Sequence, residues 1–122
     1  VVEHEDVQEI LGDATFLRSV FNNLFINAIQ AMELSGGHLG IKITPDETGR
    51  WVQFEISDTG PGIKSQNLKN IFEPYFSTKE TGTGLGLAIV HKIIEMHDGS
   101  IDVESEEGSG AKFTVKLPVA ER

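Results

Sequence analysis

Amide side chains recur in the chain at a spacing that brings them to one face of a helix. Asn23, Asn27 and Gln30 occupy positions i, i+4 and i+7, so on a helix they form one polar stripe beside an apolar face. A solvated helix edge would have the same pattern. The chemical alternative is a set of neutral oxygen donors, because Mg²⁺ accepts such an oxygen while it keeps waters and phosphate oxygens as its other ligands.

A carboxylate ends the alternating segment WVQFEISD at residues 51–58. Asp58 has the same parity as Val52, Phe54 and Ile56, so it lies on the apolar face of the expected strand. One interpretation is a turn aspartate that accepts from its own backbone before the Gly-Pro-Gly bend. The other is an acceptor in an apolar slot, where the carboxylate binds a ligand amino group and the glycines let a flat ring approach the main chain.

A glycine-rich segment opens what looks like a helix, since residues 81–94 read TGTGLGLAIVHKII. Glycine lowers helix stability by about 1 kcal/mol relative to alanine, so its repetition indicates a backbone that something must approach closely, such as a phosphate at a helix start. Lys79 lies beside these glycines, where it could bind a phosphate or remain a solvated loop lysine. The segment fits neither the dinucleotide fingerprint, in which Leu87 replaces the sixth-position glycine, nor a P-loop.

Aromatic residues precede this segment. Phe72, Tyr75 and Phe76 flank a proline and lead into residues 77–82, which have little to pack with. We interpret these six residues as a mobile loop hinged on an aromatic anchor. Positions in the hydrophobic core are the alternative for the aromatic residues themselves.

Composition limits the classes of function. A chain of 122 residues fits a single domain. Ten Lys and Arg residues against 19 Asp and Glu residues give a formal net charge of -9, which disfavours nucleic acid and anionic membranes as partners. The lack of cysteine excludes disulfides and thiolate metal sites and suits a reducing cytoplasm. No signal or membrane pattern is present, so we expect a soluble, cytoplasmic piece. The abrupt start suggests that it is a fragment of a longer chain, and that parent could be either soluble or membrane-anchored.

Hydrophobic periodicity predicts the elements that position these groups. A helix over residues 13–34, capped by Asp13, and a helix over residues 84–96 alternate with two hairpins, built from residues 38–44 with 51–58 and from residues 100–105 with 111–118. A further short helix is expected after residue 58. The predicted core positions of the first helix are Leu17, Val20, Phe21, Leu24, Phe25, Ala28, Ile29 and Met32. On the second helix, the predicted stripe on one side consists of Leu85, Ile89 and Ile93.

In order and type, four motifs resemble the catalytic, ATP-binding domain of sensor histidine kinases. The N box is NNLFINAIQAM, the G1 box DTGPGI, the F box FEPYF and the G2 box GTGLGLAIV. The resemblance covers nearly all of residues 1–122 and implies one domain with an α/β fold. That fold is the Bergerat two-layer sandwich of gyrase and heat-shock chaperone ATPases, with a mixed sheet of about five strands covered on one face by about three helices.

The resemblance also implies roles for individual residues. Asn27 would hold Mg²⁺, Asn23 would reach the phosphates, and Asp58 would accept from the adenine amino group. The implied ATP or ADP site consists of Asn23, Asn27, Gln30, Asp58, Gly60, Gly62, Ile63, Phe72, Lys79, Gly82, Thr83, Gly84, Leu85, Gly86 and Leu87. Many members carry a lysine where this chain has Gln30, and Lys79 could compensate for that lost charge. The short glycine-rich lid and the stretches NAIQAM and FSTK favour the nitrogen-regulator type of kinase.

By this resemblance, the chain donates the γ-phosphate of ATP to a histidine on a separate dimerisation and phosphoacceptor domain of the same parent, upstream of a response regulator. No phosphoacceptor is expected within the chain, which we expect to be a monomer. His4 lies in HEDVQEI, which lacks the proline of the histidine box, and is interpreted as part of the first strand. His38, His91 and His97 are interpreted as loop, helix-surface or capping residues.

Two other functions fit the same superfamily. The first alternative is a self-sufficient ATPase of the gyrase type. By resemblance, such an ATPase activates water with a glutamate that lies one helical turn before the asparagine that holds Mg²⁺. Asn23 occupies that position and cannot act as a general base. The other alternative is a serine kinase of the anti-sigma-factor type. The complete F box and the GTGLGLAIV form of the G2 box argue against it and favour the sensor kinases.

Overall fold

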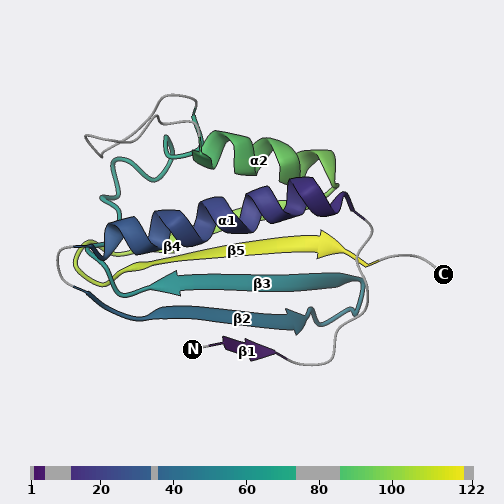
Figure 1. Ribbon diagram of the computed structural model, residues 1–122, viewed down its shortest axis with the longest axis horizontal. Helices are drawn as coiled ribbons and strands as arrows, with labels where there is room; N and C mark the ends of the chain where they lie inside the picture. Colours follow the sequence, from purple (N-terminus) through teal and green to yellow (C-terminus); the bar gives the residue numbers. More distant parts are fainter. Residues whose placement is uncertain (1, 5–11, 34–35, 74–85, 120–122) are drawn as a thin grey trace.

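The computed structural model describes residues 2–4, 12–33, 36–73 and 86–119. Its elements are β1 (Val2–His4), α1 (Ala14–Ala31), β2 (Leu39–Pro45), β3 (Trp51–Asp58), α2 (Gly86–Met96), β4 (Ser100–Ser105) and β5 (Ala111–Pro118). The strands form one sheet in the order β1-β2-β3-β5-β4, in which β1 runs parallel to β2 and the other neighbours are antiparallel. The expected mixed sheet of about five strands is therefore confirmed (Figure 1).

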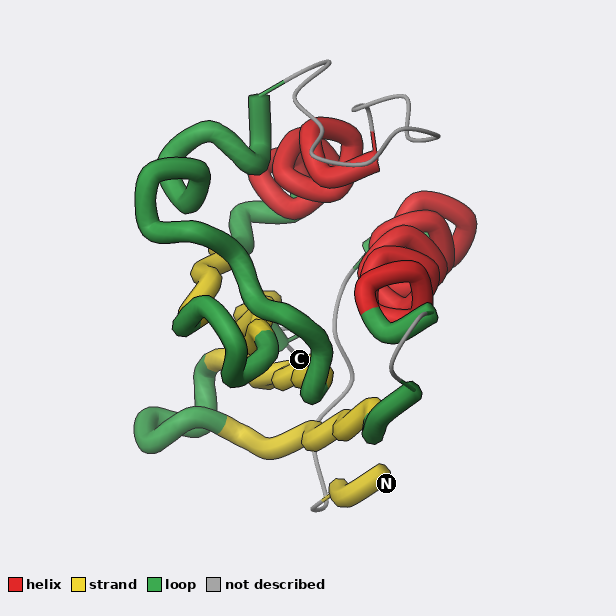
Figure 2. Tube along the Cα trace, turned by 90° about the vertical axis from the view of Figure 1, so that its left-hand side faces the viewer, coloured by secondary structure: helices red, strands yellow, loops and turns green. Residues whose placement is uncertain are grey.

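Both helices lie on the same face of this sheet (Figure 2). They run antiparallel to each other, so that the end of α2 lies near the start of α1 (Figure 1). The core between the two layers includes Val20 and Leu24 of α1, Ile56 of β3, Val90 of α2 and Phe113 of β5. The two-layer α/β architecture expected from the sequence is thus confirmed.

Helix α1 begins where the sequence indicates. Asp13 Oδ1 accepts hydrogen bonds from the backbone N–H groups of Thr15 (2.9 Å) and Phe16 (3.1 Å), which is the N-cap arrangement. Of the predicted core positions, Val20, Leu24, Ala28 and Met32 are buried, and Leu17, Phe21 and Phe25 are partly buried against the core. Ile29 was predicted wrongly, because its side chain is 55% exposed.

Helix α2 buries a different stripe from the predicted one. Val90, Ile93 and Ile94 are buried, and Leu87 packs partly against the core. Ile93 was predicted correctly, but Ile89 is 43% exposed. The actual buried face is therefore rotated by about one residue, or roughly 100°, from the predicted stripe of Leu85, Ile89 and Ile93.

The segment between β3 and α2 lacks the additional helix that we expected, as far as it is described. Residues 64–73 form consecutive turns with hydrogen bonds from N–H groups to carbonyls three residues earlier, for example Asn67 to Lys64 (2.8 Å) and Asn70 to Asn67 (2.9 Å). Ile71 is nevertheless buried and anchors this segment to the core. The described residues therefore contain two helices, where about three were expected.

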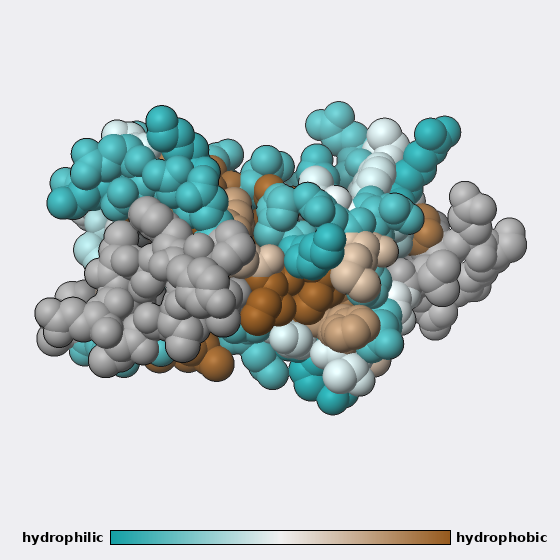
Figure 3. Space-filling view, turned by 90° about the horizontal axis from the view of Figure 1, so that it is seen from above, coloured by the Kyte–Doolittle hydropathy of each residue, from teal (hydrophilic) through white to brown (hydrophobic). Residues whose placement is uncertain are grey.

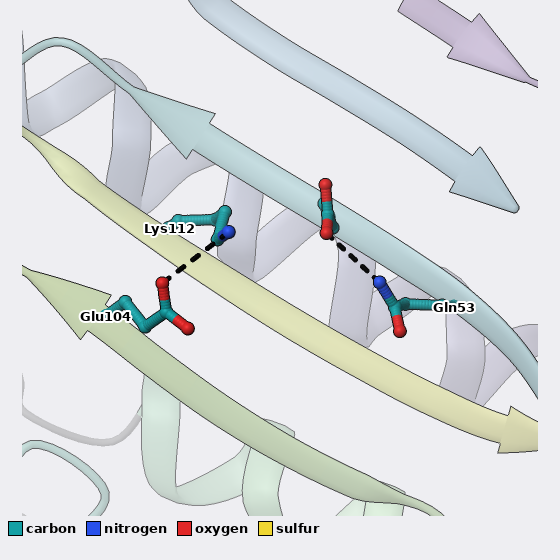
Figure 4. A network of polar contacts seen from close by, with 4 residues as sticks. Gln53, Glu104 and Lys112 are labelled. Carbon is teal, nitrogen blue, oxygen red and sulfur yellow. Dashed lines mark hydrogen bonds and ion pairs between the residues drawn. The ribbon is translucent and has the colours of Figure 1, made fainter. Parts of the chain in front are cut away.

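The uncovered face of the sheet is polar. Gln53 donates from Nε2 to Glu55 Oε1 (3.0 Å) along β3, and Lys112 of β5 pairs with Glu104 of β4 (3.5 Å between Nζ and Oε2). Figure 4 shows these contacts on neighbouring strands. The hydrophobic core therefore lies on the helix-covered face, and a ligand enclosed by the protein would bind on that face as well.

The helix side of the molecule combines hydrophilic and hydrophobic surface (Figure 3). The exposed large hydrophobic side chains among the described residues all belong to α1 and α2, namely Phe16, Ile26, Ile29, Ile89 and Met96. Neither of these two helices is both long enough and apolar enough to cross a membrane.

Candidate nucleotide site

Asp58 lies at the end of β3 on the helix-covered face, as its parity predicted. It is the buried charged residue of the described chain, with 9% of its surface exposed. Its Oδ1 accepts from the Gly60 N–H at 2.9 Å, so the turn bond of the simpler interpretation is present. A carboxylate offers about four acceptor positions over its two oxygens, so this one bond leaves it able to accept from a ligand as well.

The loop after Asp58 is closely packed on both sides. A Cβ atom at Gly60 would lie 3.0 Å from Asp58 Oδ1 and 3.1 Å from the carbonyl oxygen of Ala31, at the end of α1. Gly62 has a φ of +76°, and a Cβ atom there would collide with the carbonyl of Glu106. Gly62 therefore requires glycine, Gly60 leaves little room for a larger residue, and neither position places a side chain beside the carboxylate.

Asn23 lies at the other end of the site, against the first residue of α2. Its Nδ2 donates to the Ser19 carbonyl at 2.8 Å, and a Cβ atom on Gly86 would lie 3.1 Å from its Oδ1. The oxygen of this side chain thus faces the start of α2. The N-terminus of a helix has unpaired N–H groups that favour anions, so α2 provides backbone donors here.

Helix α1 connects the two ends of the site. Asn23 lies near its middle and Ala31, which contacts the Asp58 loop, lies at its end. Eight residues of helix span about 12 Å. This separation is suitable for an extended ligand with a flat polar group at one end and phosphates at the other.

The side-chain amides of Asn23, Asn27 and Gln30 carry neutral oxygens, which are suitable ligands for a magnesium ion. Asn27 is half-buried and Gln30 is exposed. No group of three or more His, Asp or Glu side chains within the described ranges could hold a metal ion by itself. A neutral amide oxygen at Asn27 fits a Mg²⁺ ion that takes its remaining ligands from water and phosphate, and it does not fit a cation held by protein carboxylates.

The other predicted site residues that the structure describes pack against the hydrophobic core. Ile63 and Leu87 pack partly against the core. Phe72 contacts Phe113 edge-on, with ring centroids 6.3 Å apart, and lies 5.4 Å from the His91 ring. This places Phe72 in the aromatic packing under α2, in agreement with the core alternative for the aromatic residues.

A shallow hollow of about 360 Å³ lies along α1 and is lined by Thr15, Arg18, Ser19, Asn22, Asn23 and Ile26. It contains Asn23 but no residue of the Asp58 loop, so it is not the slot for a base. The predicted site residues Lys79, Gly82, Thr83, Gly84 and Leu85, together with Tyr75 and Phe76, fall outside the described residues.

The histidines have the structural roles expected of them. His97 follows α2, with Nδ1 2.8 Å from the Ile93 carbonyl, and its Nε2 accepts from the Asp13 N–H at 3.0 Å. His91 pairs with Glu95 on the same helix (3.3 Å). His38 lies in the loop before β2, and His4 is the last residue of β1.

The sequence interpretation missed Ser105 and Gly110, which contact the Asp58 loop from the β4–β5 hairpin. Ser105 Oγ accepts from the Ile63 N–H at 2.7 Å and donates to the Gly110 carbonyl at 2.7 Å. The missed signal is the same one that identified Asp58. Ser105 shares parity with Ile101 and Val103, so it is a polar residue on the apolar face at a strand end.

Comparisons with known proteins agree with this geometry. Residues 12–121 match the family model described as "Histidine kinase-, DNA gyrase B-, and HSP90-like ATPase". Sensor histidine kinase ZraS of Escherichia coli O157:H7 is 48% identical over 116 residues, which cover 95% of this chain and 25% of ZraS. The chain therefore spans about a quarter of the length of this curated relative.

Solved structures show the same fold. The nucleotide-free catalytic domain of histidine kinase ThkA has a TM-score of 0.80 at 35% identity and covers 96% of this chain and 76% of that domain. Full-length ShkA in complex with AMPPNP has a TM-score of 0.79 at 32% identity and covers 99% of this chain and 26% of ShkA.

The fold, the motifs and these likenesses together define the class. The chain belongs to the family of histidine kinase-, DNA gyrase B- and HSP90-like ATPases. Within that family it is a catalytic domain of the histidine kinase type. The nitrogen-regulator subtype stays a prediction.

Proposed function

We propose that this chain binds Mg²⁺ and ATP and donates the γ-phosphate to a histidine on a separate dimerisation and phosphoacceptor domain of its parent kinase, which would then pass it to a response regulator. The observation that carries the proposal is the placement of Asp58. A carboxylate buried on the apolar face, beside bare glycine backbone, suits recognition of an adenine amino group.

The residues at the other end of the site suit the phosphates. In the proposed complex the base lies at Asp58 and the triphosphate extends along α1 towards Asn23 and the first turn of α2. Asn27 would contribute one oxygen to Mg²⁺, which supplies neutralisation of phosphate charge when bound. The binding of AMPPNP by ShkA, a structure of the same fold, supports a nucleotide of this kind.

Asn23 favours transfer to a protein over hydrolysis. Its Nδ2 is already bonded to the Ser19 carbonyl, and an amide cannot accept a proton from water at neutral pH. Phosphoryl transfer depends mostly on positioning and charge stabilisation, so a domain without its own base can still supply the catalytic half of a kinase.

The test combines the purified chain with γ-labelled ATP and candidate dimerisation and phosphoacceptor domains. We expect acid-labile, base-stable label on a histidine of the added domain, dependent on both this chain and Mg²⁺. Rapid release of free phosphate without labelled protein would instead indicate a gyrase-like ATPase. Label on a serine of a protein substrate would indicate the anti-sigma type of kinase.

A further inference from the structure

The turn between β4 and β5 is hydrogen-bonded to the loop that follows Asp58. The Gly108 N–H donates to the Pro61 carbonyl at 2.7 Å, and the Ile63 N–H donates to Ser105 Oγ at the same distance. Two segments more than forty residues apart in the sequence are therefore joined at the middle of the loop, at Pro61, and at its end, at Ile63. The hairpin was not among the site elements predicted from the sequence.

Ser105 occupies a specific place in the sheet. It pairs with Ala111 across β4 and β5, and Ala111 pairs with Asp58 across β5 and β3. Residues paired in this way project to the same face, so Ser105, Ala111 and Asp58 form one row on the helix-covered side. Ala111 is the small member of the row, and it leaves the two polar residues separated by one strand with little bulk between them.

The Ser105 hydroxyl bonds two backbone groups at once. Its proton goes to the Gly110 carbonyl, and its oxygen accepts from the Ile63 N–H, each at 2.7 Å. A serine hydroxyl has one donor and two acceptor positions, so this arrangement uses the donor and one acceptor. The hydroxyl thus ties the end of the Asp58 loop to the start of β5.

The backbones of the two segments also touch directly. A Cβ atom on Gly110, where φ is +86°, would collide with the Asp58 carbonyl, and one on Gly62 would collide with the Glu106 carbonyl. No side chain lies between the segments at these points to absorb a shift. A displacement of the hairpin turn would therefore displace the Asp58 loop.

We propose that Ser105 is a positioning residue for base recognition: by fixing Ile63 and Gly110, it holds residues 59–63 in the conformation that presents the Asp58 carboxylate to the adenine ring. This inference rests on the proposed function, because it concerns how the same site selects its base. It predicts that loss of the hydroxyl weakens the contact with the base and leaves the contacts with the phosphates intact.

The test compares Ser105→Ala with Ser109→Ala, since Ser109 is an exposed serine in the same turn and serves as a matched control. Competition against a fluorescent nucleotide would give the affinities of the 122-residue chain for AMP, ADP, ATP and GTP. Ser105→Ala should lower the affinities for AMP, ADP and ATP by the same factor, roughly threefold to tenfold for a lost hydrogen bond. It should also reduce the ratio of the affinity for ATP to the affinity for GTP. Ser109→Ala should change neither quantity.

Two further variants separate positioning from stability. Ser105→Thr keeps the hydroxyl and should restore the preference for ATP. Ser105→Cys has nearly the same shape but only weak hydrogen bonding, so it should lose that preference even if Ser105→Ala does not fold. Amide hydrogen exchange at Ile63 should be faster in Ser105→Cys than in the unmodified chain, because its acceptor is lost.

The outcomes distinguish this inference from the proposed function. If the unmodified chain binds no adenine nucleotide, the proposed function is wrong and the inference falls with it. If the unmodified chain prefers ATP and the Ala and Cys variants at Ser105 keep that preference, only the inference is wrong. A loss that grows with the number of phosphates would also overturn it, because it would place the defect at the other end of the site.

Discussion

Asp58 carries most of the proposed specificity. Its carboxylate can only accept, so it suits the exocyclic amino group of adenine, whereas guanine presents a carbonyl oxygen at the corresponding position. Two acceptors would then face each other in a buried site. An unmatched buried polar group costs on the order of 1 to 3 kcal/mol, and more when it is charged as Asp58 is, so we expect ATP to bind at least about tenfold more tightly than GTP.

Asp58→Asn should reduce this preference. The carboxamide oxygen can keep the bond to the Gly60 N–H, and its nitrogen then offers a donor where the carboxylate offered an acceptor. Competition of ATP and GTP against a fluorescent nucleotide measures the effect, with Asp102→Asn, an exposed residue of β4, as the control. Unchanged discrimination in Asp58→Asn would restrict Asp58 to its turn bond.

Asn27 has a metal-dependent role in the proposed function. Asn27→Ala should weaken Mg²⁺-dependent ATP binding by at least about tenfold and change Mg²⁺-free ADP binding far less, because the variant loses a metal ligand and no base contact. Calorimetry with Mg²⁺ and with a chelator distinguishes the two. Asn22→Ala removes an exposed amide next to the stripe and is the matched control. Equal losses in both conditions would mean that Asn27 is structural.

Single-residue patterns predicted the placement of Asp58 better than they predicted the apolar faces of the helices. Strand parity located Asp58 correctly because a two-residue period leaves only two faces to choose between. A helix has no such binary choice. Ile29 lies about 100° around α1 from the buried Ala28, at the edge of the predicted half, and only the placement of the sheet decides that it is exposed.

At the scale of elements, the same limit explains the wrong stripe on α2. Ile89, Val90, Ile93 and Ile94 are all apolar, so two neighbouring faces of α2 qualify, and packing against α1 and the sheet selects the one with Val90 and Ile94. The segment of residues 64–73 illustrates a different limit. It is short, and Pro74 follows it in the sequence, so helix nucleation is unfavourable and turns form instead.

The antiparallel pair of helices is fastened at one end by His97. Because its Nε2 accepts from the Asp13 N–H, the ring proton lies on Nδ1, which donates to the Ile93 carbonyl. One side chain thereby joins the start of α1 to the last turn of α2. A Cβ atom on Gly12 would lie 2.9 Å from His97 Cδ2, so the ring is also closely covered by the entering chain.

His97→Ala should therefore destabilise the fold. The variant leaves the Asp13 N–H and the Ile93 carbonyl without these bonds, and we expect a loss of about 1 to 3 kcal/mol in the free energy of unfolding. Urea denaturation measures it. His38→Ala is the control, since His38 is exposed in the loop before β2. Equal stability of the two variants would show that the bridge contributes nothing.

At the scale of the whole molecule, the charge and the motif order explain why the class of protein was predictable. A net charge of -9 leaves little general attraction for a polyphosphate, so binding must come from local geometry such as helix termini, amides and a bound cation. The four motifs contain the residues that form this local geometry, so the class of protein can be recognised from the sequence. The grip of the β4–β5 turn on the Asp58 loop was not predictable, because it depends on strand order, which periodicity does not reveal.

The whole chain is expected to bind nucleotide without labelling itself. Both His97 nitrogens are engaged, His91 pairs with Glu95, and the Asn23 amide cannot act as a base, so we infer neither a phosphoacceptor nor a hydrolytic base at these three positions. Incubation with γ-labelled ATP and Mg²⁺ should leave the protein unlabelled and release phosphate slowly, while a fluorescent nucleotide shows that the same sample binds ATP. Acid-labile, base-stable label on His4, His38, His91 or His97 would overturn this prediction. It would mean that the phosphoacceptor lies within these 122 residues and not on a separate domain.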